Sequence, residues 1–326
     1  MNALSEFALI ERFFRRPKRD PAVIVGSGDD AAVVRPSSDC ELVFSVDMLV
    51  EGRHFLPNVD PARLGHKTLA VNLSDLAAMG ATPRWALLAG ALPDNDEAWL
   101  RAFADGFYAL ADAHNVELIG GDTTRGPRNL CVTIIGEVPA GAALTRAGAE
   151  PDDDIYVSGA IGGAALALAA LQGRTVLNDD VFAQALLRLE TPEPRVALGM
   201  ALRGVATAAI DVSDGLLGDL QHILAASGTG AEIELAALPH SASIEQKLGS
   251  DERELALACL LAGGDDYELC FTAPREAHVR VAGVARELAL PLTRIGRMTR
   301  EPVLVVRAHD GSALGSLPRG FDHFAR

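Results

Sequence analysis

Aspartates recur in this chain at the ends of apolar runs, beside small residues. Six segments share this arrangement: Gly28-Asp29-Asp30-Ala31-Ala32, Ser45-Val46-Asp47, Asn72-Leu73-Ser74-Asp75, Gly120-Gly121-Asp122-Thr123-Thr124, Asp211-Val212-Ser213-Asp214-Gly215 and Gly263-Gly264-Asp265-Asp266-Tyr267. Carboxylates are rarely buried unless they are paired or bind a metal ion. Oxygen ligands without clustered histidine or cysteine suit Mg²⁺ rather than zinc. The segments therefore favour an acidic site that holds a polyphosphate through metal ions.

Each segment also has a plainer explanation when it is taken alone. A solvated turn, the end of a strand, an exposed helix position or a turn cap would each account for one of them. Asp211 and Asp214 precede a helix that either side chain is able to cap. Six separate explanations of this kind are a weaker account than one shared role, because each aspartate stands in an apolar or Gly/Ala frame. One general acid needs no such companions, whereas several Mg²⁺ ions along a triphosphate do.

Length and charge limit the class of protein. A chain of 326 residues is long for a single core, so we expect two domains. The stretch 139–154 is rich in Ala, Gly and Asp, and it predicts an N-terminal domain over 1–140 and a C-terminal domain over 150–326. A net charge of −15 argues against nucleic acid and against an anionic membrane surface as partners. An acidic protein binds phosphates through metal ions or backbone N–H groups, which reverse the local sign of charge.

The cysteines and the apolar runs indicate the compartment. Cys40, Cys131, Cys259 and Cys270 form no C-x-x-C pair, and the last three lie in apolar runs, so we expect buried, reduced thiols. The N-terminus lacks the charged and apolar pattern of a signal peptide. The apolar run 155–171 is too short and too rich in small residues for a membrane span. We therefore expect a cytoplasmic protein.

Periodicity predicts strands and helices in both halves. In the first half, we expect helices over 6–14 and 67–79, a helix opened by a capping box at 94–97, and strands over 42–49, 116–119 and 130–138. In the second half, we expect strands over 155–158, 207–212, 267–272, 293–298 and 303–307, and helices starting near 164 and over 195–204, 216–226, 253–261 and 275–288. Asn72 and Asp75 are three apart and share one helix face. The strand 116–119 is expected to end at Gly120-Gly121-Asp122. The alternation of strands and helices predicts α/β or α+β layers.

Two glycine-containing segments resemble phosphate loops only in part. Gly65-His66-Lys67-Thr68 lacks the upstream glycine of a P-loop. Gly159-Ala160-Ile161-Gly162-Gly163 follows a predicted strand and precedes a predicted helix, which is the right context. Close packing of helix on strand explains those glycines equally well, so phosphate contact and packing both stay open.

The ordered set of motifs resembles the thiamine-monophosphate kinase family over essentially the whole chain. Besides the six acidic segments, the resemblance is carried by the helix at 6–14, by Asp47-Met48-Leu49-Val50-Glu51-Gly52-x-His54-Phe55, by Leu144-Thr145-Arg146 and by Gly320-Phe321-Asp322-His323-Phe324. The run from Asp47 to His54 best separates this family from its relatives. The resemblance implies α/β and α+β architecture in a two-domain fold like that of aminoimidazole ribonucleotide synthetase. It places a mixed sheet in the N-terminal domain, which binds ATP and Mg²⁺ and forms a homodimer, and an α+β C-terminal domain that completes the ATP and substrate sites.

The resemblance also implies a reaction and a set of site residues. ATP would phosphorylate thiamine monophosphate to thiamine diphosphate, with ATP as co-substrate and several Mg²⁺ ions as cofactors. The implied metal ligands are Asp30, Ser45, Asp47, Asp75, Asp122, Asp211 and Asp214. The implied ATP contacts are Gly121, Asp122, Arg146 and Ser213, and the implied contacts with the thiamine substrate are His54, Asp265 and Phe321.

Some positions depart from the family pattern or have no assigned role. Val46 stands where Thr is usual, so a hydroxyl ligand is expected to be lost and only its backbone carbonyl remains. Asp265 stands where Glu is common, which shortens its reach by one methylene. Gly163 and Asp153 replace the usual Asp and Gly of their motifs. Asp29 and Asp266 either bind ligands or only shape their turns.

The chemistry of the acceptor predicts the mechanism. A phosphate monoester has a second pKa of about 6, so it is already ionised at neutral pH and needs no general base. The barrier is repulsion between anions, which favours direct in-line transfer assisted by Mg²⁺ and by a fixed cation such as Arg146. Two alternatives remain: another ATP-dependent enzyme of the same fold, similar to aminoimidazole ribonucleotide synthetase, and a non-catalytic module that senses nucleotide or metal.

Overall fold

The computed structural model describes residues 5–318 and 320. The chain divides into two compact units. The N-terminal unit comprises residues 1–76 and 81–141, and the C-terminal unit comprises residues 77–80 and 142–326. In the described part of the chain, every helix is too short or too polar to cross a membrane.

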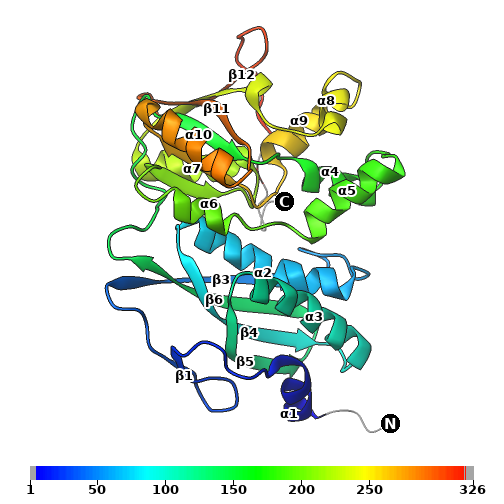
Figure 1. The fold of residues 1–326 in the computed structure, drawn as a ribbon. Coiled ribbons are helices and arrows are strands. Elements are labelled where there is room, and N and C mark those ends of the chain that lie inside the picture. The colour runs from blue at the N-terminus through cyan, green and yellow to red at the C-terminus, as the bar shows by residue number, and fades with distance from the viewer. Residues whose placement is uncertain (1–4, 319, 321–326) are drawn as a thin grey trace. The chain divides into compact units, whose positions relative to one another are not determined.

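The N-terminal unit is a four-stranded sheet with helices on one face (Figure 1). Its elements are α1 (Glu6–Leu9), the π-helical turn η1 (Ile10–Phe14), β1 (Val23–Val25), β2 (Val33–Val34), β3 (Cys40–Val50), α2 (Pro61–Ala78), β4 (Thr82–Leu92), α3 (Glu97–Ala113), β5 (Glu117–Arg125) and β6 (Asn129–Pro139). The strand order is β3-β6-β4-β5. β6 is antiparallel to both β3 and β4, whereas β4 and β5 run parallel, so the sheet is mixed.

Helices α2 and α3 cover the inner face of this sheet. Leu130, Val132 and Ile134 of β6 point to that face and are almost completely buried. The two helices approach closely at two glycines. A Cβ on Gly65 would lie 2.0 Å from the carbonyl oxygen of Phe103, and a Cβ on Gly106 would lie 1.8 Å from that of Ala62. This close contact fixes α2, which carries one of the acidic motifs.

The outer face of the sheet is partly covered by the chain that precedes β3. Val23 of β1 packs there against Trp85, Ile119 and Ile135. The covering segment, residues 20–37, forms the small β1–β2 sheet and the Gly28–Ala32 loop between its strands. Its outer-face contacts hold this loop against the sheet.

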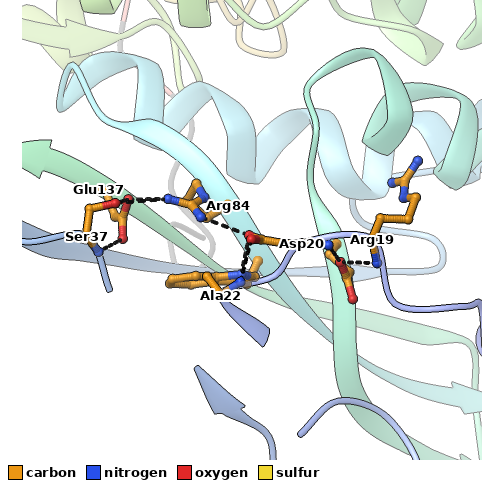
Figure 2. Close-up of polar contacts among 8 residues, drawn as sticks. Arg19, Asp20, Ala22, Ser37, Arg84 and Glu137 are labelled. Carbon is orange, nitrogen blue, oxygen red and sulfur yellow. Dashed lines mark hydrogen bonds and ion pairs between the residues drawn. The ribbon is translucent and has the colours of Figure 1, made fainter. Parts of the chain in front are cut away.

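A polar network holds both ends of the covering segment (Figure 2). Arg84 of β4 binds Asp20 at 2.9 Å and also binds Glu137 of β6. Asp20 lies before β1, and its Oδ2 also accepts the indole N–H of Trp85 at 3.0 Å. Ser37 lies after β2, and its backbone N–H donates to Glu137 at 2.7 Å. Arg84 therefore connects the two ends of the covering segment that carries the acidic Gly28–Ala32 loop.

The C-terminal unit is built on a six-stranded sheet with the order β12-β9-β11-β7-β10-β8. Its elements are β7 (Asp154–Ser158), α4 (Gly163–Leu171), α5 (Asp179–Glu190), α6 (Val196–Ala201), β8 (Ala208–Asp211), α7 (Leu216–Ser227), β9 (Gly230–Glu234), the 3₁₀ turn η2 (Leu235–Ala237), α8 (Ala242–Leu248), α9 (Arg253–Ala262), β10 (Leu269–Ala273), the 3₁₀ turn η3 (Arg275–Ala277), α10 (His278–Glu287), β11 (Leu292–Thr299) and β12 (Leu304–Arg307). Only β12 and β9 are parallel neighbours. The core includes Leu216, Leu220 and Ile223 of α7, which pack with Ile155 and Ile210 of the sheet.

The predicted elements are confirmed with three corrections. First, the strand expected to end at Gly120-Gly121-Asp122 continues as β5 to Arg125. It does so because Gly121 adopts φ +151°, where a Cβ would lie 1.9 Å from the carbonyl oxygen of Leu88. Second, the cap of α3 is Asp96, which accepts the N–H groups of Ala98 and Trp99, so the capping box predicted from Asp94 is wrong. Third, sequence periodicity missed β1, β2 and the central strand β4 in the N-terminal unit, and α5, β9 and α8 in the C-terminal unit.

The prediction of four buried thiols is only partly confirmed. All four cysteines are free, and Cys259 and Cys270 are buried. Cys40 of β3 and Cys131 of β6 are half-exposed. Both strands belong to the N-terminal sheet, whose outer face is only partly covered.

Candidate active site

One acidic group lies where the edge strand β3 faces α2. Ser45 and Asp47 of β3 pair in register with Ile134 and Val132 of β6, so they belong to the inner face of the sheet. The hydroxyl of Ser45 donates a short hydrogen bond to Oδ2 of Asp75 on α2. The backbone N–H of Asp47 donates to Oδ1 of the buried Asn72 at 3.1 Å. The helix face predicted to carry Asn72 and Asp75 therefore contacts β3, and the structure brings Ser45, Asp47 and Asp75 together.

Val46 does not belong to this group. Successive side chains of a strand alternate between faces, and Val46 lies on the outer face with 60% of its surface exposed. The side chain of residue 46 therefore lies away from the Ser45–Asp75 contact, and the expected effect of Val46 on the metal site stays a prediction. A threonine side chain at this position would point away from Ser45 and Asp47.

A second acidic group lines a cavity of about 1000 Å³ in the N-terminal unit. Asp30 of the Gly28–Ala32 loop and Gly121 and Asp122 of β5 all contribute to its wall. Asp29 shapes its own turn, because its Oδ1 accepts the backbone N–H of Asp30 at 2.9 Å. Trp99 of α3 also lines this cavity. The cavity thus combines exposed carboxylates with an apolar wall.

His54 follows β3 in a tight turn with a defined tautomer. The Nδ1 atom of His54 accepts the backbone N–H of Val50 at 3.0 Å. In a neutral imidazole, a ring nitrogen that accepts carries no proton, so the proton lies on Nε2. Nε2 is therefore a hydrogen-bond donor, which suits contact with an anion. The turn is tied to the segment between β5 and β6 by an ion pair between Glu51 and Arg128.

Two motif loops of the C-terminal unit are paired along their backbones. Val212 donates to Glu268 and accepts from Tyr267, both at 2.8 Å, and Asp265 donates to the carbonyl of Ser213 at 2.8 Å. Asp214 is exposed and Ser213 is half-buried. The structure therefore brings Ser213, Asp214 and Asp265 together, and it places Asp211 at the end of β8 with 4% of its surface exposed.

Asp265 adopts a backbone conformation that aspartate rarely tolerates. Its φ is +68°, and that of Tyr267 is +51°. Such residues cost of order 1–3 kcal/mol each and persist only where the surrounding structure holds them. Hydrogen bonds of the neighbouring residues Asp266 and Glu268 fix this conformation. Glu268 binds Arg195 through two hydrogen bonds of 2.7 and 2.6 Å, and Asp266 accepts the N–H of Gly162 at 2.7 Å.

Asp266 also contacts the Gly159–Gly163 turn and favours packing over phosphate contact there. Its carboxylate lies at the N-terminus of α4, so it satisfies a backbone N–H that a phosphate would otherwise need. Burial raises the pKa of Asp266 to about 8, and the negative charges of Glu268 and Asp265 add to this effect. A Cβ on Gly162 would lie 2.8 Å from Ile244, so packing explains that glycine.

Asp219 is a buried carboxylate that sequence reasoning missed. Its Oδ2 accepts the backbone N–H groups of Ser213, Asp214 and Gly215 at 3.0, 3.1 and 3.1 Å. Burial raises its pKa to about 7, which the three backbone hydrogen bonds oppose. A signal was present in the sequence, because Asp219 interrupts the apolar run of α7. The cap that the sequence suggested for Asp211 or Asp214 is not formed, because the N-cap of α7 is Gly215 without a side-chain cap hydrogen bond.

The remaining predicted residues have less defined surroundings. Arg146 is exposed, and its carbonyl accepts the hydroxyl of Ser227 at 3.2 Å. Phe321 lies outside the described residues.

The donor set fits Mg²⁺, the cofactor that the motifs imply. In the described part of the chain, no three His, Cys, Asp or Glu side chains converge on one metal position. Mg²⁺ keeps several waters and is usually held by one or two carboxylates together with substrate phosphates, rather than by a complete protein cage. The hydrogen-bonded Ser45–Asp75 pair with nearby Asp47, and the separate Asp30 and Asp122, match that mode of binding.

Comparison with known proteins defines the class. The family model described as AIR synthase related protein, N-terminal domain, matches residues 28–138, and the model for the C-terminal domain matches residues 150–309. Together they cover most of the chain. The chain is thus a two-domain protein with the AIR synthase-related fold, and its mixed sheets agree with that class.

Full-length relatives define the family more narrowly. The thiamine-monophosphate kinase of Escherichia coli K12 is 47% identical over 325 residues, which covers 99% of each chain. The crystal structure of thiamine-monophosphate kinase from Stenotrophomonas maltophilia K279a has a TM-score of 0.86 at 48% identity, covering 96% of this chain and 99% of that one. A structure described as AaThiL complexed with AMPPCP and TMP has a TM-score of 0.76 at 29% identity, covering 89% of each chain. The chain belongs to the thiamine-monophosphate kinase family, and it is a kinase.

Proposed function

We propose that this protein transfers the γ-phosphoryl group of ATP to thiamine monophosphate and releases ADP and thiamine diphosphate. The observation that carries the proposal is the presence of all six acidic segments in a chain 47% identical to a thiamine-monophosphate kinase. The relative described as bound to AMPPCP and TMP supports the same pair of substrates.

The proposed ligands of several Mg²⁺ ions are oxygens of both units. The N-terminal unit supplies Asp30, Ser45, Asp47, Asp75 and Asp122, and the C-terminal unit supplies Asp211 and Asp214. When bound, Mg²⁺ neutralises phosphate charge and aligns donor with acceptor. Neutralisation matters because two like charges about 4 Å apart repel by roughly 4 kcal/mol at an effective dielectric of 20.

The chain's own groups bind and orient the two substrates. Gly121, Arg146 and Ser213 contact ATP, with the guanidinium of Arg146 as a fixed positive charge on the triphosphate. The Nε2–H of His54 donates to the acceptor phosphate, in keeping with the tautomer set by Val50. Asp265 faces the organic part of thiamine monophosphate, and its rigid, positive-φ backbone supports a role in fixing that contact. Phe321 is the third proposed substrate contact.

Transfer is direct and in line, without a general base. An oxygen of the acceptor phosphate forms a bond to the γ-phosphorus as the bond to the ADP oxygen breaks. The acceptor oxygen is already ionised at neutral pH, so no proton must be removed. Free thiamine is an alcohol and would need a base, so it is expected to be a poor acceptor. A labelled γ-phosphate that stays on the denatured enzyme would contradict direct transfer.

We also propose a homodimer that forms through β3, and a cytoplasmic location. β3 is an edge strand of eleven residues. Its outer face carries an exposed apolar row, Leu42, Phe44, Val46 and Met48, with Phe44 63% exposed. Long apolar edge strands pair with other chains unless they are covered. ATP as co-substrate and four free cysteines support the cytoplasm.

One assay tests the reaction. Mg-ATP and thiamine monophosphate are incubated with the enzyme, and phosphorus NMR follows the appearance of thiamine diphosphate and ADP. Asp47→Asn is expected to abolish product formation. Asp39→Asn is a matched control, because Asp39 is an exposed turn residue of the same unit at φ +60°, which asparagine tolerates. ATP binding without turnover would favour a sensing module, and turnover with a different acceptor would favour another enzyme of the fold.

A further inference from the structure

Three backbone N–H groups of the Ser213–Gly215 loop converge on one buried oxygen. They belong to Ser213, Asp214 and Gly215 and lie 3.0–3.1 Å from Oδ2 of Asp219. Asp219 belongs to the first turn of α7 and is 3% exposed. Its own N–H donates to the carbonyl of Gly215 at 3.0 Å, so loop and helix are tied in both directions.

The carbonyl side of the same loop is held by a different segment. The carbonyls of Val212 and Ser213 accept the N–H groups of Tyr267 and Asp265, both at 2.8 Å. Gly264 makes this approach sterically feasible, because a Cβ there would lie 2.4 Å from the carbonyl oxygen of Ser213. With both the N–H and the C=O groups fixed, the loop backbone has one orientation, which leaves the carboxylate of Asp214 exposed.

A convergent set of N–H groups at a helix N-terminus ordinarily binds an external anion. Here the chain fills that position with its own carboxylate. The loop backbone is therefore not available to a phosphate group, and only its side chains are left to contact a ligand. The role of Asp219 is accordingly to orient the residues that contact substrate, and it does not itself touch the reacting atoms.

We propose that Asp219 is the positioning residue of the Ser213–Gly215 loop, which holds the side chains of Ser213 and Asp214 toward Mg-ATP. This inference rests on the proposed function, because it takes Ser213 and Asp214 as contacts of ATP and Mg²⁺. Loss of the carboxylate leaves three N–H groups without their acceptor, of which that of Gly215 is buried, and the loop no longer presents one orientation.

Three variants separate positioning from simple structural support. Asp219→Ala removes the acceptor, whereas Asp219→Asn keeps an oxygen that accepts the same N–H groups without the charge. The matched control is Asp153→Ala in the same unit. Asp153 is a carboxylate 5% exposed, and it accepts the N–H of Glu150 at 3.0 Å outside the acidic motifs.

The first measurement needs no metal or substrate. Amide hydrogen exchange of the peptide containing residues 212–216 is expected to accelerate at least 10-fold in Asp219→Ala and to stay unchanged in Asp153→Ala. The second is calorimetric binding of a non-hydrolysable ATP analogue with Mg²⁺. Asp219→Ala is expected to bind at least 10-fold more weakly, Asp219→Asn less than 5-fold, and Asp153→Ala like the wild type.

These measurements distinguish failure of the positioning role of Asp219 from failure of the proposed phosphoryl transfer. If Asp219→Ala and Asp153→Ala weaken nucleotide binding equally, or if exchange in the loop is unchanged, the positioning role is wrong. If Asp219→Ala does not fold, Asp219→Leu and Asp153→Leu, which fill the space of the carboxylate without an acceptor, give the same comparison. A wild-type protein that binds the Mg²⁺ analogue but does not phosphorylate thiamine monophosphate would overturn the proposed reaction and leave the positioning test intact.

Discussion

Replacement of Arg84 by methionine is expected to destabilise the N-terminal unit strongly. The guanidinium is shared by two carboxylates, Asp20 and Glu137 (Figure 2). The side chains are largely enclosed, with exposed fractions of 23% for Arg84, 19% for Asp20 and 6% for Glu137. Removal of one member of a buried ion pair leaves an uncompensated charge and costs about 3–5 kcal/mol. Residual solvent at Arg84 and Asp20 places the expected loss near the lower end, about 3 kcal/mol.

Tryptophan fluorescence in urea measures this loss. The chain has two tryptophans, Trp85 and Trp99, and both belong to the N-terminal unit, so their emission follows that unit. With a slope of about 2 kcal/mol per M, a loss of about 3 kcal/mol lowers the urea midpoint by about 1.5 M. Arg12→Met is the control. Arg12 and Glu97 form an ion pair in which each side chain is 46% exposed, and such pairs contribute less than about 1 kcal/mol.

The contribution of the Arg84 network to stability is expected to depend on pH. Burial tends to raise the pKa of Asp20, but hydrogen bonds from Ala22 and Arg84 outweigh it, so the pKa of Asp20 lies below its usual value. A carboxyl with a lowered pKa stabilises the fold above its ordinary pKa, and that contribution is lost as pH falls through the folded value. The difference between wild type and Arg84→Met is therefore expected to be full at pH 7 and to shrink below about pH 4. Equal urea midpoint shifts for Arg84→Met and Arg12→Met at pH 7 would refute the reasoning.

Three further predictions concern single side chains. Val46→Thr is expected to leave the Mg²⁺ concentration for half-maximal activity within 2-fold of wild type, because its side chain is on the outer face; a 5-fold change would contradict this. Phe44→Glu is expected to convert a dimer to a monomer in analytical ultracentrifugation, whereas Val279→Glu, at an equally exposed apolar position of α10, leaves the assembly unchanged. Asp266 has a pKa raised to about 8, so the folded state holds a proton that the unfolded state releases, and stability falls as pH rises toward 8. Asp266→Asn is expected to remove that slope, roughly 1 kcal/mol per pH unit between about pH 5 and 7 in urea titrations.

The elements and the acidic groups were predictable where local pattern decides structure. The shared face of Asn72 and Asp75 follows from helical spacing alone, and both residues do contact β3. The alternation of side chains along a strand likewise places Val46 and Ser45 on opposite faces of β3. This placement follows from the sequence once β3 is recognised as a strand.

Other features depend on contacts between distant residues, which sequence spacing does not contain. β5 passes through Gly120-Gly121 as a strand because of its pairing with β4, not because of its own propensity. The left-handed backbone of Asp265 follows from its pairing with the Ser213 loop and from the anchors of Asp266 and Glu268. These contacts join residues about fifty or a hundred positions apart, so tertiary structure overrides the local turn signal.

The carboxyl groups of Asp219 and Asp266 support the proposal that Mg²⁺ takes part in nucleotide binding. Asp266 accepts the N–H of Gly162 at the N-terminus of α4, and Asp219 accepts the N–H groups of the Ser213–Gly215 loop just before α7. Many nucleotide-binding proteins hold phosphate with backbone N–H groups at such places. Here these N–H groups already have partners within the chain, and each neighbouring loop carries a further aspartate, Asp214 or Asp265. Under the proposed function, Mg²⁺ and cationic side chains such as Arg146 would offset the charge of the triphosphate, so removal of Mg²⁺ is expected to weaken nucleotide binding itself and not only the rate of transfer.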